Sequence, residues 1–416
     1  MTERLAPLIA AFFFGGVALW VPIEKLFLDD IGFTPQTIGV MAAAYAALVP
    51  LLEVVSGILA DRWSRRGVLV IGNLGAFASV LIGGLSDSVW MYVVAAMFLG
   101  VYFAMQSGTF DAIVYDTVLE ETGSSDRFES VVGRVRMAES ASLTLGALAG
   151  GVLAAATAPR VTYFATLPFL AVSTMFLLRF REPRLHEVAE RHSLGEHVAI
   201  TVRALIRQRR LLPIAALLIL TALLTQAVFE FGPLWLVDAD ASAGSFGPAW
   251  AALMVSLGLG GLLAGRVHFE RWPSLVIVSV VLVGGGLTLV LAQNPAVATT
   301  AQAVLALLAI AIGIYLTRLL HDAIPSDIRS GVSSTVGAGS WIVFLPFSLT
   351  FGAVSERWGV HTAGAMILGI VGAVIALLVV VVVGARRGDL VTLEPAAEPE
   401  VAEEVEAVVA YERAAA

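Results

Sequence analysis

Cysteine is absent from this 416-residue chain, and charged residues make up only 14% of it. Without cysteine, disulfides and thiolate metal sites are excluded, and redox chemistry gives no indication of the compartment. A soluble domain contains about 25% charged residues, so the low charge argues against a string of soluble domains. The sequence also lacks the kind of basic patch that binds nucleic acid, so no nucleic-acid partner is expected.

Apolar residues are abundant instead, at 58% of the chain, and they come in long blocks. A helix of about 20 apolar residues crosses the ~30 Å hydrocarbon core of a bilayer. In lipid the backbone must satisfy its own hydrogen bonds, so these blocks are predicted to be helices. The predicted fold class is an all-α integral membrane protein with twelve transmembrane spans, at residues 5–28, 36–60, 68–86, 89–114, 133–157, 161–180, 211–236, 246–267, 273–292, 297–320, 331–354 and 360–384.

The basic residues predict how the spans are oriented. If the N-terminus is cytoplasmic, every lysine and arginine falls on the cytoplasmic side except Lys25, Arg160 and Arg357. The positive-inside rule therefore places both termini in the cytoplasm of a multi-pass protein of the inner cell membrane. The first block, from Leu5, is too long for a signal-peptide core and is expected to be retained.

The spans form two groups of six, separated by a basic segment. We expect a first bundle at 1–180, a cytoplasmic basic linker at 181–210, a second bundle at 211–385 and an acidic, disordered cytoplasmic tail at 386–416. Part of the linker could instead form an amphipathic helix on the inner membrane surface.

The two groups of spans repeat each other with a constant offset of 206 residues. The residues related by this offset are Pro7 and Pro213, Glu24 and Glu230, and Asp116 and Asp322. Duplicated six-helix bundles place a substrate site at their interface, near the middle of the bilayer.

The loop after the second span, from Gly57 to Arg66, reads GILADRWSRR. It resembles the signature loop of the major facilitator superfamily: a glycine, three residues, an aspartate and a base, then a second glycine and a run of bases. Ser64 stands where that second glycine is usual. The resemblance covers the whole chain and implies two pseudo-symmetric six-helix bundles that rock about a central cavity.

The charges of this loop are predicted to form an inner gate. Asp116, at the inner end of the fourth span, is the expected partner of Arg65. The resemblance implies that the gate holds the bundles together when the protein faces outward and breaks when it opens inward. A simpler interpretation is that the charges only anchor helix ends at the head groups. The inner-gate residues, with a second copy after the tenth span, are Gly57, Asp61, Arg62, Arg65, Arg66, Asp116, Asp322 and Arg329.

Two further stretches resemble one drug-efflux-like branch of the superfamily. The fourth span, from Gln106 to Asp116, carries its Ser-Gly…Ala…Tyr-Asp pattern. The fifth span, from Gly146 to Ala155, is similar to an antiporter motif, although Gly151 replaces the proline of that motif. A seam of small residues for close helix packing explains the fifth-span stretch equally well.

Ionisable groups inside spans indicate a transport pathway, because each costs at least ~2.5–3.5 kcal/mol at the bilayer centre. Glu24 and Glu230 are the preferred pair, since the repeat makes them symmetry mates on helices that the resemblance places at the central cavity. In a partly dry cavity a carboxylate can exchange a proton and attract a cation, and aromatic faces add cation–π contacts. The residues assigned to substrate or proton binding are Glu24, Glu230, Asp111, Trp20, Gln226, Gln106, Glu53, Phe229 and Trp235.

Alternatives remain open for several of these residues, and Glu53 could form a hydrogen bond to a neighbouring helix instead of taking part in coupling. At ~1.5 Å per residue, a continuous helix from Leu5 would put Glu24 about 28 Å away, at the outer interface, hydrated and neutralised by Lys25. Asp111 could face the cavity or join the cluster around Asp61.

The predicted function is secondary active transport by alternating access, with proton-coupled export of small lipophilic or cationic compounds. The sequence shows no nucleophile–base pairing, phosphate-binding loop or metal-ligand spacing, so no enzyme activity, cofactor or metal is expected. A carrier for metabolite uptake or facilitated diffusion is the main alternative, and a non-transporting membrane sensor or scaffold is a remote one. The expected partners are a small-molecule substrate, protons and the lipid bilayer, with the protein acting as a monomer.

Overall fold

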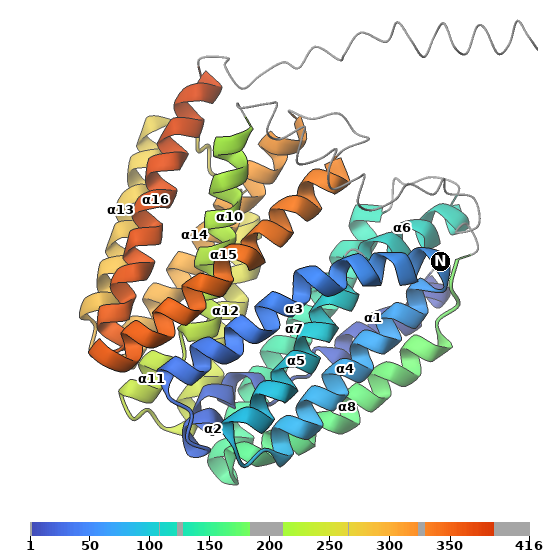
Figure 1. The fold of residues 1–416 in the computed structure, drawn as a ribbon. Coiled ribbons are helices and arrows are strands. Elements are labelled where there is room, and N and C mark those ends of the chain that lie inside the picture. The colour runs from blue at the N-terminus through green and yellow to red at the C-terminus, as the bar shows by residue number, and fades with distance from the viewer. Residues whose placement is uncertain are drawn as a thin grey trace, which may run out of the picture.

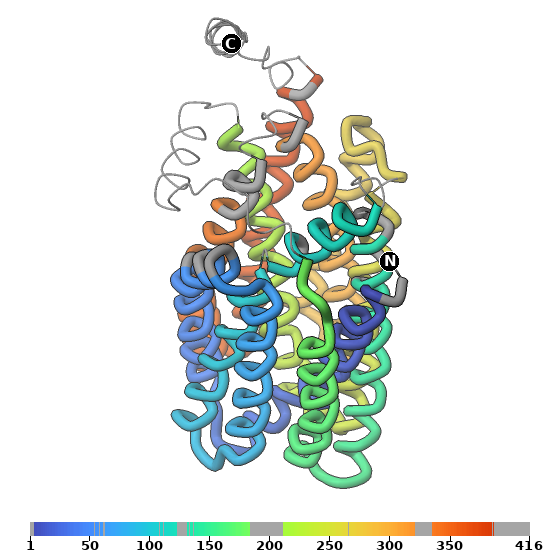
Figure 2. The backbone as a smooth tube through the Cα atoms, turned by 90° about the vertical axis from the view of Figure 1, so that its right-hand side faces the viewer, coloured from blue at the N-terminus to red at the C-terminus, as the bar shows by residue number. Residues whose placement is uncertain are grey.

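The computed structural model describes residues 2–107, 109–122, 128–183, 211–264, 266–322 and 329–386. The regular structure in these residues is helical, and the helices run side by side along one axis (Figure 1, Figure 2). Eleven helices are long and apolar enough to cross a membrane, and the segment Arg4–Gly15 is a shorter apolar helix. The expectation of a multi-pass membrane protein is therefore confirmed.

The helices of the first half of the chain are α1 (Thr2–Gly15), η1 (Val21–Ile23), α2 (Glu24–Asp30), α3 (Pro35–Arg62), α4 (Arg65–Leu85), α5 (Val89–Gln106), α6 (Thr109–Thr122), α7 (Phe128–Ala156) and α8 (Pro159–Arg179). Those of the second half are α10 (Leu212–Phe231), α11 (Leu234–Asp238), α12 (Ala243–Ala264), α13 (Trp272–Leu291), α14 (Pro295–Asp322), α15 (Arg329–Trp358) and α16 (Val360–Arg386). Most of the predicted linker and the predicted tail lie outside the described residues.

Three of the predicted continuous spans are broken. The span predicted at 5–28 stops at Gly15, unwinds through the next five residues and resumes in η1 and α2. The spans predicted at 89–114 and 211–236 break at Ser107 and at Gly232-Pro233. Glycine tolerates non-helical backbone, and proline cannot donate the helical hydrogen bond, so two of these breaks follow from local sequence.

Two helix pairs join the halves: α3 packs along α15, and α7 packs along α12. Glycines bring these backbones very close. A Cβ added to Gly151 of α7 would lie 2.9 Å from the Cα atom of Gly247 in α12, and one added to Gly352 of α15 would lie 3.1 Å from the Cα atom of Gly39 in α3. Small residues allow this packing in a membrane, where no hydrophobic force draws helices together.

These glycine contacts lie at the end of the molecule that carries α2 and α11, which we call the closed end (Figure 1). Toward the opposite end the helices of the two halves diverge (Figure 1). We call this the basic end, because the α3–α4 turn with Arg65 and Arg66 lies there. The two ends of the molecule are therefore packed differently.

Candidate substrate cavity

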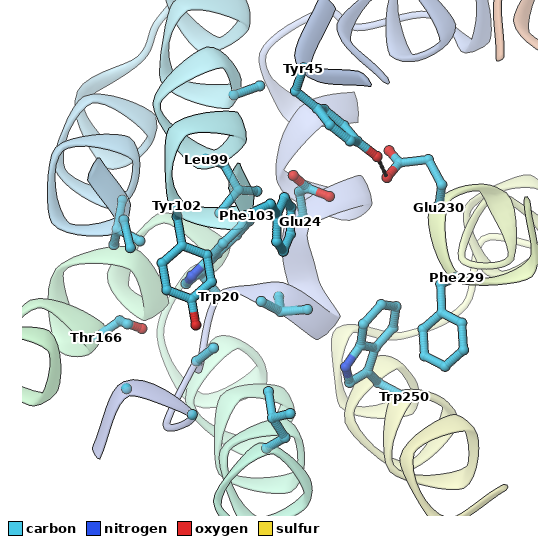
Figure 3. Close-up of a pocket in the computed structure, with 18 of the residues that line it drawn as sticks. Trp20, Glu24, Tyr45, Leu99, Tyr102, Phe103, Thr166, Phe229, Glu230 and Trp250 are labelled. Atoms are coloured by element: carbon cyan, nitrogen blue, oxygen red, sulfur yellow. Dashed lines mark hydrogen bonds between the residues drawn. The ribbon is translucent and has the colours of Figure 1, made fainter. Parts of the chain in front are cut away.

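A cavity of about 410 Å³ lies between the two halves, and its walls are mostly apolar and aromatic (Figure 3). The first half contributes side chains from α2, α3, α4, α5, α7, α8 and the segment after α1, and the second half contributes side chains from α10, α12 and α15. The aromatic lining residues are Trp20, Tyr45, Tyr102, Phe103, Phe229, Trp250 and Trp341, and the acidic ones are Glu24, Glu139 and Glu230.

The break after α1 is what brings Glu24 to the cavity. Because the chain unwinds there, Glu24 is the first residue of α2 and lines the cavity instead of lying one straight helix away from Leu5. Glycines of α7 make room for the unwound backbone. A Cβ added to Gly146 would lie 3.1 Å from the backbone nitrogen of Ala18, and one added to Gly150 would lie 2.9 Å from the carbonyl carbon of Leu19.

The predicted glycine seam of the fifth span thus has two distinct contacts. One face of α7 packs against the unwound segment of its own half, and Gly151 packs against Gly247 of the other half. These contacts agree with the interpretation of the stretch as a seam of small residues for close helix packing. The antiporter interpretation of the same stretch stays a prediction.

A buried lysine joins the two predicted glutamates. The Nζ atom of Lys25 donates to Oε2 of Glu24 and to Oε1 of Glu230, at 2.6 Å in both cases. Lys25 is only 2% exposed to solvent. The expected pairing of Lys25 with Glu24 is present, but Lys25 is buried rather than hydrated, and its second bond, which joins the two halves, was missed. We call Glu24, Lys25 and Glu230 the acid–lysine cluster.

Tyrosine hydroxyls complete the hydrogen bonding of both carboxylates. Tyr45 of α3 donates to Oε2 of Glu230 at 2.6 Å (Figure 3). Tyr92 of α5 donates to Oε1 of Glu24 at 2.9 Å, and its hydroxyl lies 2.7 Å from that of Tyr163. Sequence reasoning missed all three tyrosines, because the signal that links them to the glutamates is spatial.

Three of the other predicted binding residues line the same cavity. Trp20 packs against Tyr163 with ring centroids 5.3 Å apart, and Phe229 meets Trp250 edge to face at 5.5 Å. Gln226 donates to Ser340 at 3.4 Å, whereas its buried Oε1 atom has no hydrogen-bond partner within the part of the chain that is described.

Other predicted binding residues lie elsewhere. Trp235 is not among the described cavity residues: beyond the Gly232-Pro233 break, its ring N–H donates to the carbonyl of Leu289 in α13 at 2.9 Å. The cation–π role expected of Trp235 is therefore wrong. Gln106 lines a separate small pocket beside α1, α4 and α8, and Glu53 faces Ser107 at the α5–α6 break.

At the basic end, the expected ion pair between Arg65 and Asp116 is present. Arg65 also donates to the carbonyl of Ala112 at 3.0 Å. Glu182, which sequence reasoning missed, accepts from the hydroxyl of Ser64 and from the backbone N–H of Arg65, both at 2.5 Å. Glu182 lies just after α8, at the start of the predicted linker, and the other partners belong to the first half, as does Gly57 on α3.

Ser64 has a structural reason to replace the usual glycine. It is the N-cap of α4, and its hydroxyl accepts the backbone N–H of Gly67 at 2.8 Å. Arg66 donates to the carbonyl of Phe180 at 3.1 Å, which ties the α4 terminus to the end of α8.

The remaining gate residues cannot be placed in the same way. The described part of the structure does not include the side chains of Asp61, Arg62, Asp111, Asp322 and Arg329. The gate between the halves, and the role of its second copy, therefore stay predictions.

Comparison with known proteins identifies the family. A family model described as Major Facilitator Superfamily matches residues 5–337 of the chain. The chain belongs to the major facilitator superfamily. All three members of the acid–lysine cluster line the cavity between its two halves. A similar relative is Multidrug resistance protein 2 of Bacillus subtilis (strain 168), 28% identical over 187 residues that cover 44% of each chain. The chain thus matches less than half the length of this relative.

Solved structures of superfamily transporters share the fold. The nucleoside transporter NupG superposes with a TM-score of 0.71 at 13% identity, covering 92% of this chain and 99% of that one. The D-xylose-proton symporter superposes with a TM-score of 0.64 at 14% identity, covering 92% of this chain and 96% of that one. The predicted fold class is confirmed, and the transported compound is a separate question.

Proposed function

We propose that this transporter exports small lipophilic or cationic compounds in exchange for protons, by alternating access to the cavity between its halves. In this proposal the protein lies as a monomer in the inner cell membrane, with the basic end in the cytoplasm, as the positive-inside rule requires. The described arrangement, packed at the closed end and diverging at the basic end, is then the inward-facing state.

The observation that carries the proposal is the make-up of the cavity wall. Its charged lining residues are three carboxylates, Glu24, Glu139 and Glu230, and one ammonium, Lys25, and they sit among aromatic rings. Such a wall suits a compound that is apolar over most of its surface and positively charged at one point, because carboxylates attract the charge and aromatic faces add cation–π contacts. The partial match to a multidrug resistance protein supports the same class of substrate.

The route between the two states follows from the same packing. To face outward, the transporter must separate α3 from α15 and α7 from α12 at the closed end, and it must bring the basic ends together. The Arg65–Asp116 pair is already in place within the first half. In the proposed outward-facing state, the inner gate adds contacts from Asp61 and Arg62 to the second half.

A metabolite carrier is the second candidate, because the structural neighbours include a nucleoside transporter and a sugar symporter. Sugars and nucleosides need many hydrogen-bonding side chains to replace their water. Among the described uncharged residues of the cavity wall, only Gln226 and Thr166 carry a polar side chain that is not aromatic, and the other hydrogen-bonding groups are those of tyrosine and tryptophan rings. This wall favours the lipophilic cation.

Flux in proteoliposomes tests the proposal. With the purified transporter in vesicles that carry an imposed pH gradient, we expect a fluorescent lipophilic amine to move opposite to the protons, and D-xylose and uridine to remain where they are. Vesicles without protein and vesicles equilibrated by a protonophore are the controls. Movement of the amine with the protons, or no movement that depends on the gradient, would contradict proton-coupled export.

A further inference from the structure

The two glutamates of the acid–lysine cluster are symmetry mates in sequence, but their partners are not symmetric. Glu24 is bonded by Lys25 and Tyr92, which both belong to its own half. Glu230 is bonded by Lys25 and Tyr45, which both belong to the opposite half. Every described bond of the Glu230 carboxylate therefore crosses the interface that alternating access must open.

Building on the proposed function, we infer that Glu230 is the exchangeable carboxylate of this transporter. When the halves separate at the closed end, Glu230 releases Lys25 and takes up either a proton or the cationic group of the substrate. Glu24 keeps Lys25 as its partner in both states. The binding site for the exchanged cation is thus the place that the Lys25 ammonium occupies in the described structure.

Rigid-body movement explains the asymmetry. Glu24 and Lys25 are consecutive residues of α2, so rocking one half against the other leaves their 2.6 Å contact unchanged. Glu230 is on α10 and moves away from α2 and α3 together with the second half. A carboxylate that loses its partner in a poorly hydrated site must be neutralised by a proton or by another cation.

The surroundings of Glu230 offer no replacement from its own half. Among the described cavity residues of the second half there is no lysine, arginine or histidine. The titratable and charged groups that face the cluster come from the first half: Lys25 and Glu24 on α2, Tyr45 on α3, Tyr92 on α5, Glu139 on α7 and Tyr163 on α8.

Gln226 adds a second acceptor to the proposed exchange site. It lies one helical turn before Glu230, and its Oε1 atom is buried without a hydrogen-bond partner in the described chain. This oxygen can accept the O–H of a protonated Glu230 or an N–H of a bound amine. Phe229, Trp250 and the aliphatic wall then contact the apolar body of the substrate.

The inference can be tested by a change of pH alone, without a transported substrate. Because the chain contains no cysteine, cysteines introduced at Gln36 and Glu356 carry its only two spin labels. The backbone nitrogen of Gln36 lies 3.5 Å from Oε2 of Glu356 across the closed end, so their label distance reports separation of the halves. In the wild-type background, in nanodiscs, a change from mildly alkaline to mildly acidic pH should increase the separated population, since protons bind the state with free Glu230.

The glutamate variants decide which carboxylate responds. We expect Glu230→Gln to be separated at every pH, with the pH response lost, because the amide mimics the protonated acid. Glu24→Gln should keep the response at more acidic pH, because Lys25 is then held by Glu230 alone. Loss of the response in Glu24→Gln with its retention in Glu230→Gln, or an unchanged response in both, would overturn the inference.

Milder variants guard against misfolding. Tyr45→Phe removes one bond of Glu230 and should move the response to less acidic pH, whereas the matched Tyr92→Phe removes one bond of Glu24 and should leave it in place. Equal shifts in both tyrosine variants would overturn the inference. Failure of amine flux with these distance changes intact would count against the proposed export function and leave the exchange site standing.

Discussion

The closed end and the basic end differ in whether their described polar contacts cross between the halves. At the closed end, Lys25 and Tyr45 of the first half bond to Glu230 of the second, so the charges cross the interface. At the basic end, the described bonds of Arg65 go to Asp116 and Ala112 within the first half. Among the described residues, ionic contacts thus tie the halves together at the closed end, whereas each ion pair at the basic end lies within one half.

The largest loss of stability is expected when Lys25, the cation shared by Glu24 and Glu230, is removed. We expect Lys25→Met to lower the free energy of unfolding by about 3–5 kcal/mol, because it leaves buried carboxylates without a positive partner. The measurement is thermal unfolding in detergent. The double variant Lys25→Met/Glu24→Gln, which removes one negative charge as well, should recover much of the loss. A single variant as stable as wild type would mean that Lys25 does not hold the cluster.

The second-largest effect is expected from a change in the backbone packing at the closed end. Gly151→Val places a branched side chain against the Gly247 backbone, where even a Cβ atom would be 2.9 Å away, so the α7–α12 contact must open. We expect a cost of about 1–3 kcal/mol for the packed state, measured as a larger separated population of the Gln36/Glu356 label pair. Gly258→Val is the matched control on α12, because a Cβ there meets nothing within 4 Å. Equal effects of the two variants would contradict this account.

The smallest effect is expected at the basic end. Ser64→Gly introduces the residue usual in the superfamily and removes the cap of α4, and a glycine cap costs only a few tenths of a kcal/mol. The lost bond to the half-buried Glu182 carboxylate adds about 1.5 kcal/mol, the lower end of the range for a hydrogen bond to a charged group. Thermal unfolding should therefore change slightly, and the label distance at the closed end should not change. A loss comparable with that of Lys25→Met would show that Ser64 does more than cap one helix.

Length and hydropathy were sufficient to predict the membrane-spanning helices, whereas their arrangement in two bundles was predicted from the internal repeat and from the resemblance to the superfamily. The predicted spans match the helices to within a few residues at most ends, because crossing a bilayer fixes both the length and the apolar content of a helix. The exceptions are the breaks after Gly15, at Ser107 and at Gly232-Pro233. Straight-helix geometry therefore left the outer interface open as an alternative for Glu24, and it did not indicate that Trp235 lies away from the cavity.

Of the candidate site, only the residues related by the internal repeat could be predicted from the sequence. The offset between Glu24 and Glu230 indicated a pair, and the structure brings both to one cavity. The sequence paired Lys25 with Glu24 only, and its bond to Glu230 was missed because the two residues are 205 positions apart in the chain. Tyr45 and Tyr92 come from other helices, and hydropathy alone does not indicate which face of a helix they occupy.

Distances at both ends of one molecule test the central claim most directly. A second label pair at Trp63 and Arg318, exposed residues of the first and second halves, reports the basic end, as the Gln36/Glu356 pair reports the closed end. We predict reciprocal changes as the pH falls: the closed-end distance lengthens while the basic-end distance shortens, with equal populations from both pairs. Independent changes at the two ends, or a basic end that never closes, would contradict alternating access to a single cavity.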